Sequence, residues 1–228
     1  MTHIANTGER ILLEKETPLM IARHFCAYGF AKRLCIDKKV LDIGCGEGYG
    51  SNFLAKTAKS VTGIDYSSEA VAYASEKYRK PNLKFMRLDV KELGSLAEKF
   101  DRVCCFQVIE HLADADLFLE DIRDLLLEEG RLIISTCNMK DASPDSDVPA
   151  NKFHVREYYF IQFKELLQRH FGSVEMHGLK RTARLNFYRR LKKIGICKQL
   201  YVNAGPECFK IVRSRFDDAL DFIAVCGK

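Results

Sequence analysis

The chain has 228 residues and a formal net charge of +5, and its 47% hydrophobic and 29% charged residues exclude a disordered or fibrous protein. Its nine cysteines form no Cys-x-x-Cys pair, so the spacings of disulfide scaffolds, zinc sites and thioredoxin-like motifs are missing and we expect reduced thiols. Because there is no run of about eighteen apolar residues and no signal-peptide pattern at the N-terminus, we expect a cytoplasmic protein without a membrane span.

Short apolar runs alternate with segments of helical periodicity along most of the chain. Five runs have the length and hydrophobicity of strands in a covered parallel sheet: residues 39–43, 60–65, 83–88, 102–107 and 131–136. Helical patterns occupy residues 18–34, 67–79 and 114–129. Beyond the fifth strand we expect an irregular loop at 141–151, a helix near 156–170, and β-like stretches at 173–179 and 220–226. The alternation predicts an α/β fold with a doubly wound, Rossmann-like sheet.

The first predicted strand leads directly into the glycine-rich sequence DIGCGEGYG, residues 42–50. Glycines at alternate positions let the backbone turn sharply and approach a ligand closely, so this loop is predicted to bind a polar ligand. The dinucleotide pattern G-x-G-x-x-G fails in both registers, because Tyr49 and Ser51 stand where the third glycine is needed. A phosphate-binding P-loop fails as well, since no Gly-Lys-Ser/Thr follows.

The loop instead has an acid two residues before G-x-G-x-G, which resembles motif I of the class I S-adenosylmethionine (SAM) methyltransferases. Asp65 ends the second strand, 23 residues after Asp42, where a carboxylate can accept hydrogen bonds from both ribose hydroxyls of an adenosyl ligand. Asp89 follows the third strand, where this family places an acid against the adenine amino group. All three acids are expected at the carboxyl edge of the sheet, where open α/β folds bind ligands. The resemblance covers about residues 38–137.

The resemblance implies a seven-stranded sheet of order 3-2-1-4-5-7-6 whose last strand is antiparallel, with helices on both faces. It also implies SAM as cofactor and S-adenosyl-L-homocysteine as product, in a single domain over residues 1–228 with a helical N-terminal lid over about 1–36. The glycines would lie under the methionine portion, Tyr66 and Val90 would flank the adenine, and Gln107 would border the methyl donor. The residues assigned to the cofactor are Asp42, Gly44, Gly46, Gly48, Asp65, Tyr66, Asp89, Val90 and Gln107.

Two clusters near the carboxyl ends of strands four and five are candidates for the acceptor side. The first, the sequence FQVIEHL, resembles a segment of ubiquinone-pathway O-methyltransferases and of many small-molecule relatives. Its candidate catalytic residues are Glu110 and His111; the alternative role of His111 is to cap or pack the loop before the next helix. Quinone-type members carry a further acid where this chain has Gln107, which completes a set suited to a divalent metal. Because Gln107 removes an anionic ligand, we predict no metal.

The second cluster is the sequence NKFHVRE after the fifth strand. Together with the N-terminal sequence TGER, it resembles a methyltransferase subgroup associated with the modification of glycans and cell-surface polysaccharides. His154 is a candidate catalytic base, because imidazole titrates near neutral pH. Arg156 can pair with an acidic sugar or a phosphate, and Arg10 and Tyr158 are further candidate substrate residues. The alternative is that Arg156 and the glutamate after it make local bonds in the first turn of a helix.

The positive charge is concentrated in one segment, because residues 177–216 contain eleven Lys or Arg and a single acid. That segment carries +10 and the rest of the chain −5. We expect residues 180–216 to be an insertion between the last two strands, with Leu185, Tyr188 and Leu191 on one face of a basic amphipathic helix. Three interpretations stay open: a solvated helix that packs on its own domain, a surface for an anionic membrane or lipid-linked substrate, and a site for RNA phosphates or a protein partner.

Together these motifs predict a SAM-dependent methyltransferase that acts on oxygen of a small-molecule or glycan acceptor. Because a sulfonium leaving group needs no protonation, such an enzyme mainly aligns the nucleophile and excludes water. The alternatives are a quinone or lipid-precursor O-methyltransferase and a non-catalytic SAM-binding protein whose basic surface binds membrane or RNA. Nucleic acid is disfavoured as substrate, because no N-P-P-Y tetrapeptide and no appended RNA-binding module occur. Membrane binding would place the protein peripherally at the inner membrane face.

Overall fold

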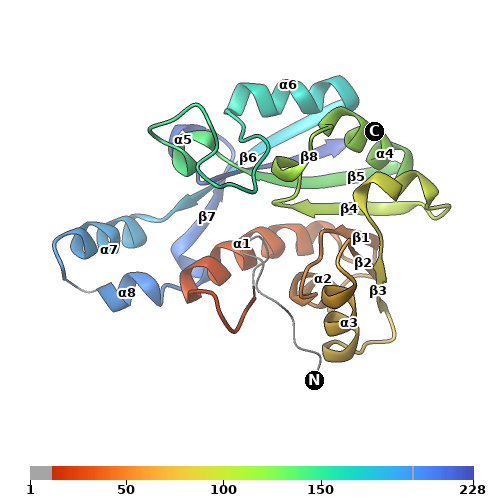
Figure 1. Cartoon of the computed structure of the whole chain (residues 1–228), viewed down its shortest axis with the longest axis horizontal. Coiled ribbons are helices and arrows are strands. Elements are labelled where there is room, and N and C mark those ends of the chain that lie inside the picture. The colour runs from red at the N-terminus through yellow and green to blue at the C-terminus, as the bar shows by residue number, and fades with distance from the viewer. Residues whose placement is uncertain (1–11, 197) are drawn as a thin grey trace.

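The computed structural model describes residues 12–196 and 198–228, and its centre is one mixed β-sheet (Figure 1). In these two ranges the sheet has eight strands in the order β3-β2-β1-β4-β5-β8-β6-β7. Strands β1 to β5 are parallel, whereas β8 is antiparallel to both of its neighbours and β7 is antiparallel to β6. The strands are β1 (Lys39–Ile43), β2 (Ser60–Asp65), β3 (Leu83–Arg87), β4 (Phe100–Phe106), β5 (Leu126–Cys137), β6 (Ser173–Arg181), β7 (Phe209–Val212) and β8 (Asp221–Gly227).

The observed sheet confirms the predicted α/β fold class and the predicted strand order, with one strand more. The predicted sixth and seventh strands are β6 and β8, and β8 is the antiparallel strand between β5 and β6. The additional strand, β7, lies at the sheet edge inside the segment predicted as an insertion. Its alternating pattern covers only four residues and includes Lys210, so pairing with β6 rather than local periodicity decides its conformation.

Helices cover both faces of the sheet (Figure 1). On one face α1 and α2 bury Tyr28 and Leu54 in one hydrophobic cluster, and on the other face α4 and α6 bury Phe118 and Phe163 in a second cluster. Among the helices described, none combines the length and the apolar composition that a bilayer crossing requires. The helices are α1 (Pro18–Leu34), α2 (Tyr49–Leu54), α3 (Ser68–Lys77), α4 (Ala115–Leu125), α5 (Met139–Ala142), α6 (Phe160–His170), α7 (Ala183–Lys193) and α8 (Lys198–Val202).

Helix α4 ends four residues earlier than the sequence pattern predicts. It stops at Leu125 because Leu126 begins β5 and pairs with Phe100 of β4. A register shift follows before Arg102 pairs with Arg131. The leucine run at this point has helical spacing, so tertiary pairing overrides the local preference.

Helix α1 is fastened to the sheet by an ion pair. The guanidinium of Arg23 binds both carboxylate oxygens of Asp221 in β8, with 2.7 Å between Nε and Oδ2. Thr17 caps the start of the helix, because its hydroxyl accepts a hydrogen bond from a backbone amide of the first turn. The helix is therefore held in a fixed orientation, and it brings the side chains of His24 and Tyr28 to the carboxyl edge of the sheet.

Candidate functional site

A cavity of about 360 Å³ opens at the carboxyl ends of β1, β2, β3 and β4. Seven of the nine residues that the sequence assigns to a cofactor line it, and the two exceptions are Asp42 and Gly48. Helix α1, which lies within the segment predicted as an N-terminal lid, contributes His24 and Tyr28, two residues that the sequence did not assign to the site. The lining residues are His24, Tyr28, Ile43, Gly44, Cys45, Gly46, Glu47, Tyr49, Ile64, Asp65, Tyr66, Leu88, Asp89, Val90, Lys91, Phe106, Gln107, Val108, His111 and Leu112.

The loop between β1 and α2 has a backbone that requires glycine. Gly44, Gly46 and Gly48 have φ angles of 70°, 51° and 83°, which lie in the left-handed region that side chains disfavour. A Cβ on Gly44 would lie 2.5 Å from Cγ2 of Val108, and a Cβ on Gly48 would lie 2.7 Å from Cβ of Ala74. The loop therefore forms a cradle of bare backbone between its neighbours.

We expect Gly48→Ala to lower the free energy of unfolding by about 2–4 kcal/mol, because it combines a positive φ with overpacking. Gly29→Ala is the matched control, because no atom lies within 4 Å of a Cβ at this position in α1. We expect the control to stabilise the protein by about 0.5–1 kcal/mol, the usual gain in a helix interior. Urea denaturation measures both values, and equal midpoints for the two variants would contradict the strained-cradle interpretation.

Asp42 lies beneath the glycine loop and is fully buried. The Ser51 hydroxyl donates to its Oδ2 at 2.6 Å, and the Tyr28 hydroxyl lies 3.3 Å from both carboxylate oxygens. Burial raises the pKa of Asp42 to about 7, against the lowering effect of these hydrogen bonds. Asp42 therefore joins β1, α1 and α2 under the loop.

Asp65, the last residue of β2, connects the glycine loop to the start of α3. Its Oδ2 accepts the amide of Gly46 at 2.9 Å, and its Oδ1 accepts the amide of Ser67 at 3.0 Å. The carboxylate lines the cavity, and beside it Tyr66 is 56% exposed. Asp65 is therefore positioned by backbone groups on both sides of the cavity floor.

Asp89 follows β3 and combines two roles. Its Oδ1 accepts the amide of Lys91 at 3.0 Å and caps a short 3-10 turn, while Glu92 hydrogen-bonds back to the Asp89 amide. Asp89 and Val90 also line the cavity next to Tyr66. The capping role, an alternative often found for an acid at a strand end, is therefore compatible with a ligand contact.

Helix α1 supplies a polar pair that the sequence analysis missed. His24 and Tyr28 lie one helical turn apart and both line the cavity. Nδ1 of His24 lies 3.1 Å from the hydroxyl of Tyr49, and burial lowers the pKa of His24 to about 4, so its ring is neutral at pH 7. Two polar aromatic residues at positions i and i+4 of a largely apolar helix were the signal that could have identified them.

Gln107 lies at the end of β4 in a strained backbone conformation. Its φ is 55°, which is uncommon for a residue with a side chain and occurs often at functional sites. Its Nε2 donates to the hydroxyl of Ser135 at 3.1 Å, and the residue lines the cavity. A hydrogen bond to β5 therefore orients the Gln107 side chain at the cavity wall.

His111 lines the cavity from the turn after β4, and the loop before α6 holds it there. Its Nδ1 lies 3.0 Å from the carbonyl oxygen of Phe153. A carbonyl only accepts hydrogen bonds, so Nδ1 donates in this contact, and in the neutral ring Nε2 carries the lone pair. The same loop donates the amides of Val155 and Arg156 to the carbonyl of Glu110, at 2.8 and 3.1 Å. The carbonyl of Phe153, which lies 42 residues further along the chain, thus fixes the tautomer of His111.

His154 lies behind His111 and does not line the cavity. The two rings meet edge to face, with 4.9 Å between their centroids. Nδ1 of His154 lies 2.7 Å from Oε1 of the buried Glu157, and its Nε2 lies 3.0 Å from Nδ2 of Asn151. Both ring nitrogens of His154 therefore contact other groups of the protein, and His154 is not among the residues that line the cavity, whereas His111 is.

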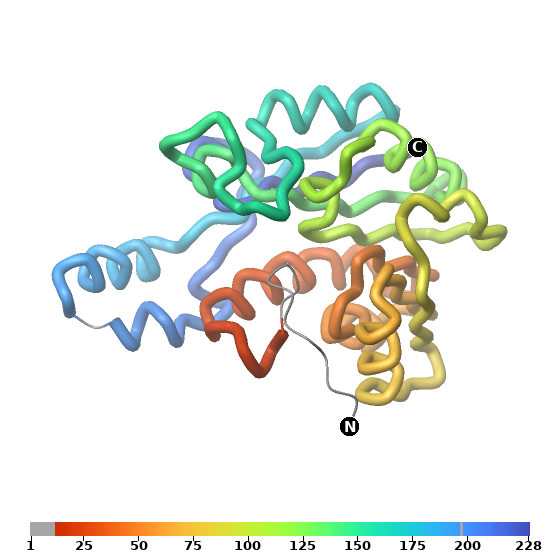
Figure 2. The backbone as a smooth tube through the Cα atoms, viewed as in Figure 1, coloured from red at the N-terminus to blue at the C-terminus, as the bar shows by residue number. Residues whose placement is uncertain are grey.

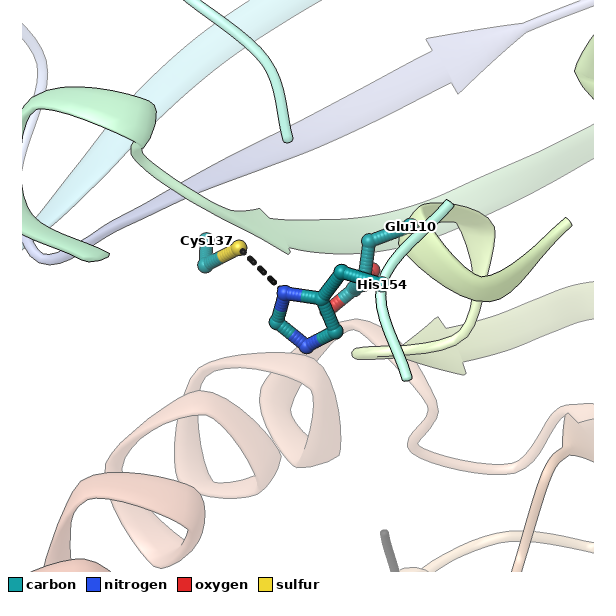
Figure 3. Close-up of side chains that lie close together, drawn as sticks. All are labelled: Glu110, Cys137 and His154. Atoms are coloured by element: carbon teal, nitrogen blue, oxygen red, sulfur yellow. Dashed lines mark hydrogen bonds between the residues drawn. The ribbon is translucent and has the colours of Figure 1, made fainter. Parts of the chain in front are cut away.

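Glu110, Cys137 and His154 come together beside this histidine pair (Figure 3). Each offers one atom that could coordinate a metal ion, and these three atoms lie within 4.8 Å of one another. Sγ of Cys137 is 3.9 Å from Nδ1 of His154. Oε2 of Glu110 accepts the hydroxyl of Thr136 at 3.1 Å, while its Oε1 has no partner among the residues that the structure describes. Burial raises the pKa of Glu110 to about 8 and also raises that of Cys137, so both are mainly protonated at pH 7.

We expect the raised pKa of Glu110 to make the protein less stable as the pH rises. The unfolded carboxyl loses its proton at about pH 4, whereas the folded one keeps it to about pH 8, so the free energy of unfolding falls across this interval. Glu110→Gln keeps the neutral form, so its stability should depend less on pH, and it should exceed wild type by about 2–4 kcal/mol at pH 8. Urea denaturation at pH 5 and 8 measures this, with the exposed Glu129→Gln as control; parallel pH profiles for wild type and Glu110→Gln would contradict it.

The candidate substrate residues do not gather around the cavity. Tyr158 is 1% exposed and packs against Phe163, and the guanidinium of Arg156 lies 5.2 Å from the centre of the Tyr158 ring. Both border a separate hollow between α4 and α6. Because α6 begins at Phe160, Arg156 lies in the preceding loop rather than in a first helical turn. Arg10 lies outside the described residues.

The doubly wound sheet, the glycine cradle and the acids at its carboxyl edge define the class I methyltransferase architecture. A model of the methyltransferase-domain family matches residues 36–177. The chain therefore belongs to this family, as the sequence motifs predicted.

Two groups of curated relatives are similar to the chain. A Mycobacterium tuberculosis protein named "Probable S-adenosylmethionine-dependent methyltransferase" is 36% identical over 181 residues, 78% of this chain and 65% of that protein. The match thus spans somewhat less than two thirds of that relative. The ubiquinone biosynthesis O-methyltransferase of Glaesserella parasuis is 35% identical over 108 residues, 44% of this chain and 46% of that protein.

Solved structures share the fold at low sequence identity. The N-methyltransferase NodS from Bradyrhizobium japonicum, crystallised with S-adenosyl-L-homocysteine, is 17% identical with a TM-score of 0.62, over 92% of this chain and 87% of that chain. The magnesium protoporphyrin IX methyltransferase from Synechocystis, with the same ligand, is 18% identical with a TM-score of 0.58, over 92% and 83%. These likenesses support the architecture.

Proposed function

We propose that the chain is a SAM-dependent methyltransferase that methylates an oxygen of a small-molecule or glycan acceptor. One observation carries this proposal: a single cavity has the glycine cradle, Asp65 and Asp89 at one end, and Gln107 and His111 at the other. The first end suits an adenosyl ligand and the second suits a group that gives up a proton. The family membership and the SAM-dependent relatives support the same activity.

The residues around the cradle fit SAM. The glycines with positive φ angles leave room for a ligand against the backbone of the loop. The carboxylate of Asp65 lines the cavity, where it can accept hydrogen bonds from ribose hydroxyls. Tyr66 and Val90 would enclose the adenine, and Asp89 would meet its edge. When bound, SAM supplies a methyl group on a sulfonium, a leaving group that needs no proton.

His111 is the base that the geometry favours for a hydroxyl acceptor. Its Nδ1–H is directed to the carbonyl of Phe153, so the basic nitrogen is Nε2 of a residue that lines the cavity. His154 supports the His111 ring from behind and is itself held by Glu157. His154 and Glu110 therefore act as positioning residues in this proposal, and His111 as the catalytic residue.

A quinone or lipid-precursor acceptor is the second candidate. The match to a ubiquinone biosynthesis O-methyltransferase favours it, and so does the apolar part of the cavity wall, formed by Phe106, Val108 and Leu112 near His111. These side chains can contact an aromatic ring or the first part of an isoprenoid chain.

A transfer screen with methyl-labelled SAM tests the proposed function. The acceptors are nucleotide sugars, lipid-linked glycans, quinols and RNA, and the product is analysed for the methylated atom. We expect label on a hydroxyl oxygen of a glycan or quinol. Label on RNA alone would overturn the acceptor class, and SAM binding without transfer to any acceptor would support the non-catalytic alternative.

A further inference from the structure

Helices α7 and α8 form an arm that projects from the body of the molecule (Figures 1 and 2). Residues 182–205, here called the basic arm, leave the sheet after β6 and return before β7. Its base is anchored, because Leu185 and Ala204 are buried in the cluster that also contains α1 residues. Toward the tip the described side chains are exposed or only partly covered.

The basic arm extends from the edge of the sheet at which the cavity opens. Strand β8 is antiparallel to both β5 and β6, so β6 runs in the same direction as β5 and β4. The carboxyl end of β6 at Arg181 therefore lies at the same edge as the carboxyl ends of the strands around the cavity. Whatever the arm contacts is thus on the open side of the candidate site.

The arm carries apolar side chains that face away from the protein. Phe187 in α7 is 57% exposed, and Ile194, which caps the end of that helix, is 68% exposed. Leu185 is buried, and Tyr188 and Leu191 are partly buried, which agrees with the predicted common face of these three residues. The exposed apolar side chains of the basic arm are Phe187, Ile194, Ile196 and Leu200.

The charge of the arm is uniformly positive, because residues 182–205 contain no Asp or Glu. In the described part of the chain no salt bridge pairs its cations with a carboxylate; Arg184 contacts Tyr188 and Lys192 lies over the ring of Tyr201. The first contact lies within α7 and the second joins α7 to α8. Neither places a carboxylate beside a cation of the arm. The cations are Arg184, Arg189, Arg190, Lys192, Lys193 and Lys198.

We propose that the basic arm binds the surface of an anionic lipid bilayer. Its exposed apolar stripe would enter the boundary between headgroups and acyl chains, and the cations beside the stripe would pair with lipid phosphates. Arg184 and Arg190 flank Phe187 on the helix surface, which is the arrangement of an interfacial amphipathic helix. Because the arm extends from the open edge, binding would turn the cavity toward the bilayer.

The apolar stripe favours a bilayer over RNA. Backbone phosphates of RNA would use the cations but would leave Phe187, Ile194 and Leu200 in water. A bilayer removes these side chains from water and satisfies the cations together. The proposal does not depend on methyl transfer, since it can hold for a protein that only binds SAM.

Co-sedimentation with sucrose-loaded vesicles tests the proposal. The full chain is mixed with phosphatidylcholine vesicles, with or without about 30 mol% phosphatidylglycerol. We expect a partition coefficient at least about tenfold higher for the anionic vesicles, falling in about 0.5 M salt because the charges are screened. Phe187→Ser with Ile194→Ser, and separately Arg190→Glu with Lys193→Glu, should each lower it by about tenfold or more.

Matched variants on the body of the protein are the controls. Leu117→Ser with Ile161→Ser removes equally exposed apolar side chains, and Lys59→Glu with Arg79→Glu reverses two exposed cations outside the arm. All variants should keep the wild-type SAM affinity, which reports the fold. The proposal would be overturned if the protein partitioned equally into both vesicle types. It would also be overturned if the arm variants and the control variants lowered the partition coefficient equally. A short RNA provides a further test. If it displaces the protein from the vesicles, and if it binds Phe187→Ser with Ile194→Ser as tightly as wild type, the proposal is also overturned.

Discussion

Replacing Asp65 with alanine should weaken SAM binding by about 30- to 100-fold, which corresponds to roughly 2–3 kcal/mol for the loss of a charged hydrogen-bond acceptor. The effect is large because the Asp65 carboxylate also accepts the amides of Gly46 and Ser67. Its removal thus takes away the proposed ribose contact and loosens the cavity floor. Isothermal titration calorimetry with SAM and with S-adenosyl-L-homocysteine measures the change.

Asp114→Ala is the matched control for this variant. Asp114 accepts the amide of Leu117 at the start of α4, as Asp65 accepts that of Ser67 near α3, but it does not line the cavity. We expect the control to leave SAM affinity within about twofold and to cost about 1 kcal/mol of stability as a lost helix cap. If Asp65→Ala binds SAM as tightly as the control does, the cofactor is not held at this edge of the sheet.

Replacing His111 with alanine should lower kcat by about 100-fold or more on the acceptor found by the transfer screen, because a general base commonly contributes that much. SAM affinity should change by less than about threefold, since His111 follows β4, whereas Asp65 ends β2, two strands away in the sheet. Single-turnover measurements with bound SAM separate the chemical step from binding and product release.

His154→Ala distinguishes the base from the residue that supports it. Because His154 contacts the His111 ring from behind and does not line the cavity, its loss should reduce kcat by only about tenfold and leave KM nearly unchanged. The control is His170→Ala at the end of α6, which should leave kcat and KM unchanged. If His154→Ala lowered kcat as much as His111→Ala or more, His154 would be identified as the base instead.

The position of the glycine loop and its acids at one edge of the sheet could be predicted because these residues belong to short motifs next to strands. The glycine loop, Asp65 and Asp89 each follow a strand directly, and parallel strands bring their carboxyl ends together whatever the intervening helices do. The acceptor end could be predicted only as a set of candidates. His111 and His154 were both plausible, and long-range hydrogen bonds, such as the one from His111 to Phe153, decide which of them reaches the cavity.

The sequence by itself determined the positions of the parallel strands and the residues of the glycine cradle, because these depend on local spacing and on hydrophobic periodicity. The family and the order of the strands followed from the resemblance that the motifs carry. Only the tertiary structure decided the early end of α4, the edge strand β7 and the wall that His24 and Tyr28 add from α1. It also decided the direction of the apolar stripe on the basic arm. Each of these depends on pairing or packing between distant segments, which local sequence patterns do not encode.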